Sequence, residues 1–200
     1  MRICFIGDSL VNGTGDPTLL GWVGRVCAAA RRRGQDITCY NLGIRGDTSA
    51  EIARRWQDES ARRLPDGIDG RLVFSFGAND CVSRDGAPRV AAAQALANAR
   101  AVLEGARQRH PTLMLGPPPT ALAEADPRIA ALSRELARLA AELSVPYLDL
   151  YTPLAAMPLW RLEITVGDGA HPGAAGYALI ADLVEGWAPW RRWTEPVSAP

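Results

Sequence analysis

The sequence contains no lysine, since all 22 of its basic residues are arginine. This absence excludes chemistry that requires a lysine amine, such as a Schiff base or a lysine-containing phosphate loop. Long apolar runs are also absent: no stretch approaches the roughly 20 residues of a membrane-spanning helix, and the apolar segment before Gly7 is too short for a secretory signal. We therefore expect a cytoplasmic protein without membrane insertion.

The sequence also has few cysteines and no net charge. The four cysteines form no CxxC pair, which indicates free thiols in the core. Acidic and basic residues balance at 22 each, so no strong field favours nucleic acid. With 200 residues, 48% of them apolar, the chain can form one globular domain, which we place at residues 1–187, followed by a tail at 188–200. The oligomeric state is left open.

Short apolar runs bounded by turn residues alternate with longer segments of helical period. This pattern predicts an α/β fold in which helices cover both faces of a parallel sheet. The predicted strands lie near Ile3–Ile6, Ile37–Leu42, Leu72–Phe76, Leu113–Leu115 and Pro146–Leu150.

Several helices carry recognisable start signals. Thr48 with Glu51 three residues later is typical of a capping box, and Asp126 before Pro127 predicts an N-cap followed by a first-turn proline. The last helix is expected to run from Pro172 to about Trp187. The tryptophans at positions 187, 190 and 193 are interpreted first as docking the tail onto the domain, with partner binding as the alternative.

Polar motifs follow four of the five predicted strands. They are Gly7-Asp8-Ser9-Leu10, Asn41-Leu42-Gly43, Gly77-Ala78-Asn79-Asp80 and, after a long loop, Asp168-Gly169-Ala170-His171-Pro172. In open parallel sheets, functional groups gather at the carboxyl ends of the strands. We therefore expect these motifs to share one site.

Ser9 is the candidate nucleophile of this site, and it needs a base. Of the two histidines, His110 directly precedes the fourth strand and so falls at the opposite edge, which leaves His171 as the base. Asp168 lies three residues earlier in the same turn and can hold the imidazole through Nδ1. The backbone amides of Ser9 and Gly43 and the side-chain amide of Asn79 are the candidate oxyanion donors.

Together these motifs resemble the four blocks of the SGNH hydrolases, also called GDSL esterases and lipases. The resemblance spans the chain from the first strand to the last helix. It implies a flavodoxin-like, three-layer α/β/α fold with a five-stranded parallel sheet, and neither a metal nor an organic cofactor. The expected activity is hydrolysis of short-chain acyl esters of a small molecule, acetyl esters among them, through an acyl-enzyme.

Two other functions are considered. The same site could transfer the acyl group to an alcohol or sugar, because triad and oxyanion donors serve either acceptor. A flavin-binding module is suggested by Gly13–Thr18, which has a passing likeness to a phosphate loop, although Pro17 removes an amide. Substrate identity depends on the surrounding loops, notably Trp22, residues 117–119 and residues 151–166, where Leu159 and Trp160 are candidates for lining an acyl site.

Overall fold

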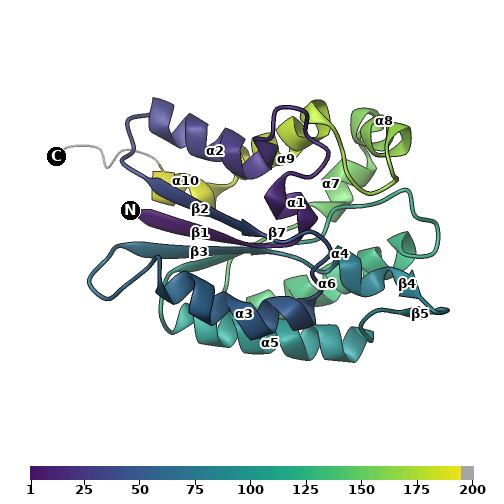
Figure 1. Cartoon of the computed structure of the whole chain (residues 1–200), viewed down its shortest axis with the longest axis horizontal. Helices are drawn as coiled ribbons and strands as arrows, with labels where there is room; N and C mark the ends of the chain where they lie inside the picture. The colour runs from purple at the N-terminus through teal and green to yellow at the C-terminus, as the bar shows by residue number, and fades with distance from the viewer. Residues whose placement is uncertain (195–200) are drawn as a thin grey trace.

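The computed structural model describes residues 1–194. Its central sheet has five parallel strands in the order β2-β1-β3-β6-β7. These are β1 (Arg2–Gly7), β2 (Thr38–Gly43), β3 (Gly70–Ser75), β6 (Thr112–Leu115) and β7 (Tyr147–Leu148). Helices cover both faces of the sheet (Figure 1), which confirms the expected three-layer α/β/α fold.

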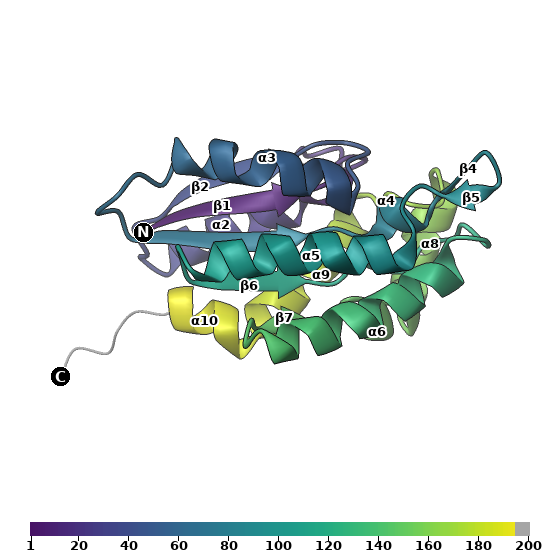
Figure 2. The ribbon, with the colours of Figure 1, turned by 90° about the horizontal axis from the view of Figure 1, so that it is seen from below.

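Three long helices pack on one face and two on the other, with a short helix beside the pair. The first group is α3 (Ser49–Ala61), α5 (Ala92–Arg107) and α6 (Asp126–Glu142); the second is α2 (Gly21–Arg32) and α9 (Ala174–Gly186), with α10 (Ala188–Thr194) (Figures 1 and 2). Side chains of the central strand β1 belong to the hydrophobic cores on both faces of the sheet. Cys4 and Ile6 join the core on the α3 side and Ile3 and Phe5 the core on the α2 side, as the alternation of a strand requires.

The fifth strand is shorter than predicted. Only Tyr147 and Leu148 pair with β6, opposite Met114 and Leu115. The chain then leaves the sheet because Asp149 Oδ1 accepts the backbone amide of Thr152 at 3.2 Å and turns it into a helix.

The long loop expected before Asp168 is largely helical, so that expectation is wrong. It contains α7 (Tyr151–Ala155) and α8 (Pro158–Val166), with Pro158 in the first turn of α8. Trp160 and Ile164, one turn apart, are buried, whereas Leu162 and Val166 on another face are 59% and 80% exposed. Leu159 is also exposed.

Short elements cluster at the carboxyl ends of the strands. Helix α1 (Ser9–Asn12) follows β1, and α4 (Ala78–Cys81) follows β3. A small antiparallel hairpin of β4 (Ser83–Arg84) and β5 (Ala87–Pro88) extends beyond α4. The sequence patterns did not predict these elements, which surround the candidate site.

The predicted helix starts are accurate to within two residues. The Thr48 backbone amide donates to Glu51 Oε2 at 2.8 Å, so the capping box is present. Asp126 is the first residue of α6 and not its N-cap; its carboxylate instead accepts the amide of Thr120 and the hydroxyl of Tyr151. The last long helix begins at Ala174, two residues after Pro172, with Gly173 as its N-cap.

Residues 188–194 of the expected tail form α10, and residues 195–200 lie outside the described part of the chain. Trp190 of α10 is 1% exposed, contacts the ring of Phe5 and donates its indole N–H to Glu185 at 2.9 Å.

All four cysteines are free thiols. Within residues 1–194, no helix has both the length and the hydrophobicity needed to cross a membrane.

Candidate active site

Ser9 lies at the carboxyl end of β1, as the first residue of α1. The preceding Gly7 permits close packing with β3, since a Cβ atom there would lie 2.0 Å from the carbonyl oxygen of Ser75. Asp8 caps α1 because its Oδ1 accepts the amide of Leu10 at 2.9 Å. Strand end and cap together fix the position of Ser9, which is 5% exposed.

Asp168 and His171 lie in one tight turn before α9. Asp168 Oδ1 accepts the backbone amides of Ala170 and His171, at 3.0 and 2.9 Å, and its Oδ2 lies 2.7 Å from His171 Nδ1. The other ring nitrogen, Nε2, lies 2.8 Å from Ser9 Oγ. The structure thus brings Ser9, His171 and Asp168 into one hydrogen-bonded chain.

The charge of Asp168 determines the direction of these hydrogen bonds. Partial burial alone would raise the pKa of this carboxyl. Hydrogen bonds from the His171 ring and from the amides of His171 and Ala170 outweigh burial, and the pKa falls from the ordinary 3.8 to about 2. Asp168 is therefore ionised at neutral pH and accepts the proton on Nδ1. The lone pair of Nε2 is then free to accept the hydroxyl proton of Ser9.

Asn79, in α4 after β3, presents its side-chain amide at the same edge. Its Nδ2 donates to the carbonyl oxygen of Asp47 at 2.9 Å and lies 3.4 Å from Asp8 Oδ2, a long contact. The first bond fixes the amide. The weak second one leaves a proton that can be given to a stronger acceptor.

The structure assigns the amide of Gly43 elsewhere. This N–H donates to Asn41 Oδ1 at 3.0 Å, and a Cβ atom on Gly43 would lie 2.2 Å from the backbone nitrogen of Asn12. Gly46, three residues later, has a φ of +88° and open space at its Cβ position. Within residues 1–194, neither the Gly46 amide nor that of Ser9 has an acceptor. The Gly46 amide is therefore free to donate a hydrogen bond, whereas the amide of Gly43 is not.

Sequence reasoning missed Arg55, which holds the loop between β2 and α3. Its guanidinium donates to the carbonyl oxygens of Gly7 and Leu42, at 2.8 and 3.0 Å, and to Asp47 Oδ2 at 2.6 Å. No local signal marks Arg55 among the arginines of the chain, because its partners lie on other elements.

Two carboxyl groups are buried behind the site. Burial raises the pKa of Asp8 to about 7, despite the hydrogen bond from the Leu10 amide. Burial also raises the pKa of Asp80, although its carboxylate accepts the Ser49 hydroxyl and, at 3.0 Å, the Ser49 amide. Asn98 donates to the same hydroxyl oxygen at 2.9 Å. These groups connect α4 to the start of α3.

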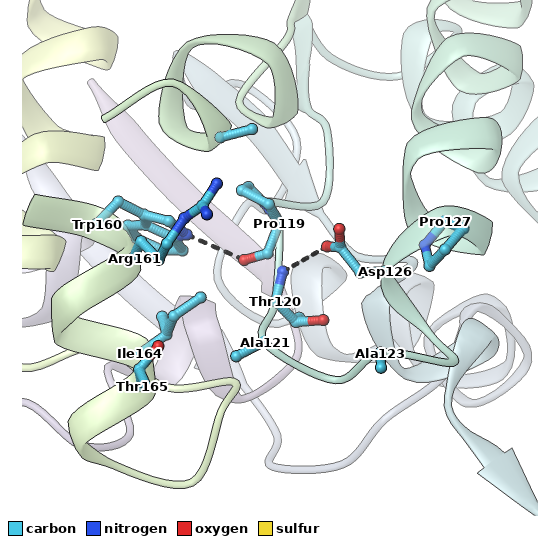
Figure 3. Close-up of a pocket in the computed structure, with 11 residues that line it drawn as sticks. Pro119, Thr120, Ala121, Ala123, Asp126, Pro127, Trp160, Arg161, Ile164 and Thr165 are labelled. Carbon is cyan, nitrogen blue, oxygen red and sulfur yellow. Dashed lines mark hydrogen bonds between the residues drawn. The ribbon is translucent and has the colours of Figure 1, made fainter. Parts of the chain in front are cut away.

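Of the hollows that border α8, two lie on opposite sides of this helix. The larger, of about 580 Å³, is lined by Asp168 and His171 and by Arg45 from the β2–α3 loop. The smaller, of about 390 Å³, lies between α8 and the loop after β6 (Figure 3). There Trp160 donates its indole N–H to the Pro119 carbonyl at 3.0 Å. Ser9 and His171 do not line the smaller hollow.

Hydrogen bonds to Asp16 hold the loop at Gly13–Thr18 in place. Asp16 accepts the amides of Thr18 and Gly21, at 3.0 and 2.8 Å, and pairs with Arg25. Those amides are therefore not free for a phosphate.

His110 packs its ring against Gly70 at the opposite edge of the sheet, as predicted. Within residues 1–194, no group of three or more His, Cys, Asp or Glu side chains is arranged to hold a metal.

Residues 5–179 of the chain match the model of the GDSL-like lipase/acylhydrolase family. The crystal structure of a lipase/acylhydrolase from Enterococcus faecalis is similar, with a TM-score of 0.77, 25% identity and 92% of each chain covered. An acetylxylan esterase from Geobacillus stearothermophilus has a TM-score of 0.75 and 19% identity over 94% of this chain and 95% of its own. The latter similarity shows a shared fold.

One curated protein also matches in part. A segment of 80 residues is 29% identical to the uncharacterized protein YpmR of Bacillus subtilis (strain 168), covering 39% of this chain and 31% of that protein. The match thus spans about a third of the length of this relative.

Proposed function

The chain belongs to the GDSL-like lipase/acylhydrolase family, and from this premise we propose that it is a serine esterase that hydrolyses short-chain acyl esters of a small molecule. The observation that carries the proposal is the hydrogen-bonded chain from Ser9 through His171 to Asp168, with distances of 2.8 and 2.7 Å. A nucleophile, a base and an orienting carboxylate in this order are what acyl transfer through serine requires.

In the first half of the reaction, His171 Nε2 removes the hydroxyl proton of Ser9 while Oγ attacks the ester carbonyl carbon. The imidazolium that forms is stabilised by ionised Asp168. It then gives its proton to the departing alcohol oxygen, the ester C–O bond breaks, and an acyl-enzyme remains. In the second half His171 removes a proton from water, which attacks the acyl carbon; the bond to Ser9 Oγ breaks, the imidazolium returns the proton to Oγ, and the acid is released.

The tetrahedral intermediates place a negative charge on the former carbonyl oxygen. We assign its stabilisation to the amides of Ser9 and Gly46 and to the side chain of Asn79. The two backbone amides have no acceptor within residues 1–194, whereas the Gly43 amide is taken by Asn41. This assignment replaces Gly43 by Gly46.

Short acyl groups are favoured by the surroundings of Ser9. The residue is only 5% exposed, so little open space for a long acyl chain surrounds its Oγ. The acetylxylan esterase of the same fold acts, by its name, on an acetyl ester. Hydrolysis of a series from acetate to laurate esters tests this point, and faster hydrolysis of the laurate ester would contradict it.

The central test is Ser9→Ala. This variant should fold normally and lose about three or more orders of magnitude in kcat on phenyl acetate, because the triad acts as a unit. Covalent labelling by a fluorophosphonate should disappear with it. Ser60→Ala, a buried serine at the far end of α3, is the matched control and should keep both activity and labelling. Near-wild-type turnover by Ser9→Ala would remove the nucleophile from the proposal.

Transfer to an alcohol uses the same acyl-enzyme, so the acceptor is tested separately. Product analysis with a glycerol or sugar acceptor present should show free acid as the main product. Predominant formation of a new ester would reassign the protein as an acyltransferase.

A further inference from the structure

The hollow of about 580 Å³ beside His171 has walls of different chemistry. Helix α8 contributes Leu162 and Val166, which lie one turn apart and are 59% and 80% exposed. The β2–α3 loop contributes Arg45, whose side chain is exposed. The hollow therefore offers an apolar wall and a cation next to the histidine ring.

Both carboxylates that line this hollow already have partners. Asp168 accepts hydrogen bonds from the His171 ring and from two backbone amides. Glu163 Oε2 accepts the Gly176 amide at 3.2 Å, in the first turn of α9, where the helix dipole favours a negative charge. Neither carboxylate forms an ion pair with Arg45.

Arg45 has no hydrogen-bond acceptor or carboxylate partner within residues 1–194. Other exposed arginines share this property, but Arg45 alone lines the hollow that contains His171. The backbone of Arg45 is held in place, because it belongs to the loop that Arg55 fixes through hydrogen bonds to Asp47 and to the Leu42 carbonyl. A guanidinium presented in this way can bind a carboxylate or phosphate with two parallel hydrogen bonds.

We infer that Arg45 determines specificity by binding an anionic group, a carboxylate or a phosphate, on the alcohol part of the ester. The inference rests on the proposed function and names the substrate class. The alcohol part is the one concerned because His171, which lines the hollow, must protonate the alcohol oxygen as it leaves. Leu162 and Val166 would contact the apolar body of the same group.

Two esters that share an acetyl group and a phenyl ring provide the test: phenyl acetate is neutral, and 4-acetoxybenzoate carries a carboxylate on the leaving group. In Arg45→Gln, kcat/KM for 4-acetoxybenzoate should fall about tenfold, as expected for loss of one charge-assisted hydrogen bond. The value for phenyl acetate should stay within about twofold. Arg45→Lys should retain part of the preference, and added NaCl should reduce it in the wild type.

The matched control is Arg161→Gln, which removes an exposed arginine of α8 that lines the other hollow, shown in Figure 3. It should leave the ratio of the two rates unchanged. An unchanged ratio in Arg45→Gln, or a fall in Arg161→Gln instead, overturns the inference while the esterase function stands. If the wild type hydrolyses neither ester, the proposed function fails and the inference fails with it.

Discussion

Arg55 and Asp47 form an ion pair, Nε to Oδ2 at 2.6 Å, at the base of the loop that carries Gly46. The same guanidinium donates to the last residue of β1, Gly7, and to Leu42 near the end of β2. The backbone carbonyl of Asp47 in turn accepts the side-chain amide of Asn79. Arg55 thus connects the strand that precedes Ser9 with the loop that carries Gly46 and, through Asp47, with the side-chain amide of Asn79.

Arg55→Met should lower both stability and activity. The side chains of Arg55 and Asp47 are only 15% and 11% exposed, so removing the cation leaves a nearly buried carboxylate unpaired, at a cost of about 3 kcal/mol in the free energy of unfolding. Urea unfolding measures this. The adjacent Arg54→Met removes an exposed ion pair to Glu51 and should cost under about 1 kcal/mol. Equal effects of the two variants would show that the Arg55 network contributes little.

Asn79→Ala should lower kcat by about two to three orders of magnitude with little change in KM, because an oxyanion donor acts mainly in the transition state. The control is Asn12→Ala, which changes an exposed asparagine next to Gly43 at the end of β2. This variant should keep the kcat of the wild type. A rise in KM with kcat intact would assign Asn79 to ground-state binding instead.

The pH dependence of kcat/KM should reflect His171 and not Asp168. The pKa of Asp168 is about 2, so this carboxyl remains ionised throughout the range in which the enzyme is assayed. Activity should be low in acid and rise with pH, because a general base acts only in its unprotonated form. Asp168→Asn should lower kcat by about three to four orders of magnitude through the wrong tautomer, whereas Asp149→Asn, at a half-buried aspartate after β7, should not. A flat wild-type profile from acid to alkali, with chemistry rate-limiting, would exclude His171 as the base.

Asp8 should make the protein less stable as the pH rises. Its folded-state pKa of about 7 lies above the ordinary value of 3.8, so the folded state binds the proton more tightly. The resulting stabilisation is complete below about pH 4 and is lost as pH rises through about 7, a change of up to roughly 4 kcal/mol. Asp8→Asn keeps an oxygen for the Leu10 amide but cannot ionise.

Urea unfolding of wild type and Asp8→Asn at several pH values isolates this effect. Carboxyls with lowered pKa values, such as Asp168 and Glu51, produce the opposite trend in both proteins and cancel in the difference. The difference should change most between pH 4 and 7. Parallel curves would show that Asp8 does not titrate in this range.

The sequence predicted the parts of the site that are set by strand ends and local turns. Ser9 follows a strand that alternates between two cores, and Asp168 and His171 share one short turn. These two segments were expected to meet because functional groups gather at the carboxyl edge of an open parallel sheet. Gly43 could not be excluded, because only the fold shows that the Asn41 side chain takes its amide.

Contacts between distant elements that do not follow from a shared edge of the sheet could not be predicted. Arg55 binds carbonyl groups at the ends of β1 and β2, the former 48 positions away, and nothing in its own segment marks it. Helix α8 was missed, although Trp160 and Ile164 have helical spacing and Pro158 lies in its first turn. The short elements α1, α4 and the β4–β5 hairpin lack a periodic pattern of their own.

The hydrogen bond between Ser9 and His171 joins residues 162 positions apart. The proposed nucleophile and base therefore come from the first and last parts of the fold, and their hydrogen bond forms only when both parts have folded together. The same separation makes ester hydrolysis a direct signal of complementation: a cut in the exposed β4–β5 turn at Asp85–Gly86 yields one fragment with Ser9 and Asn79 and another with Asp168 and His171.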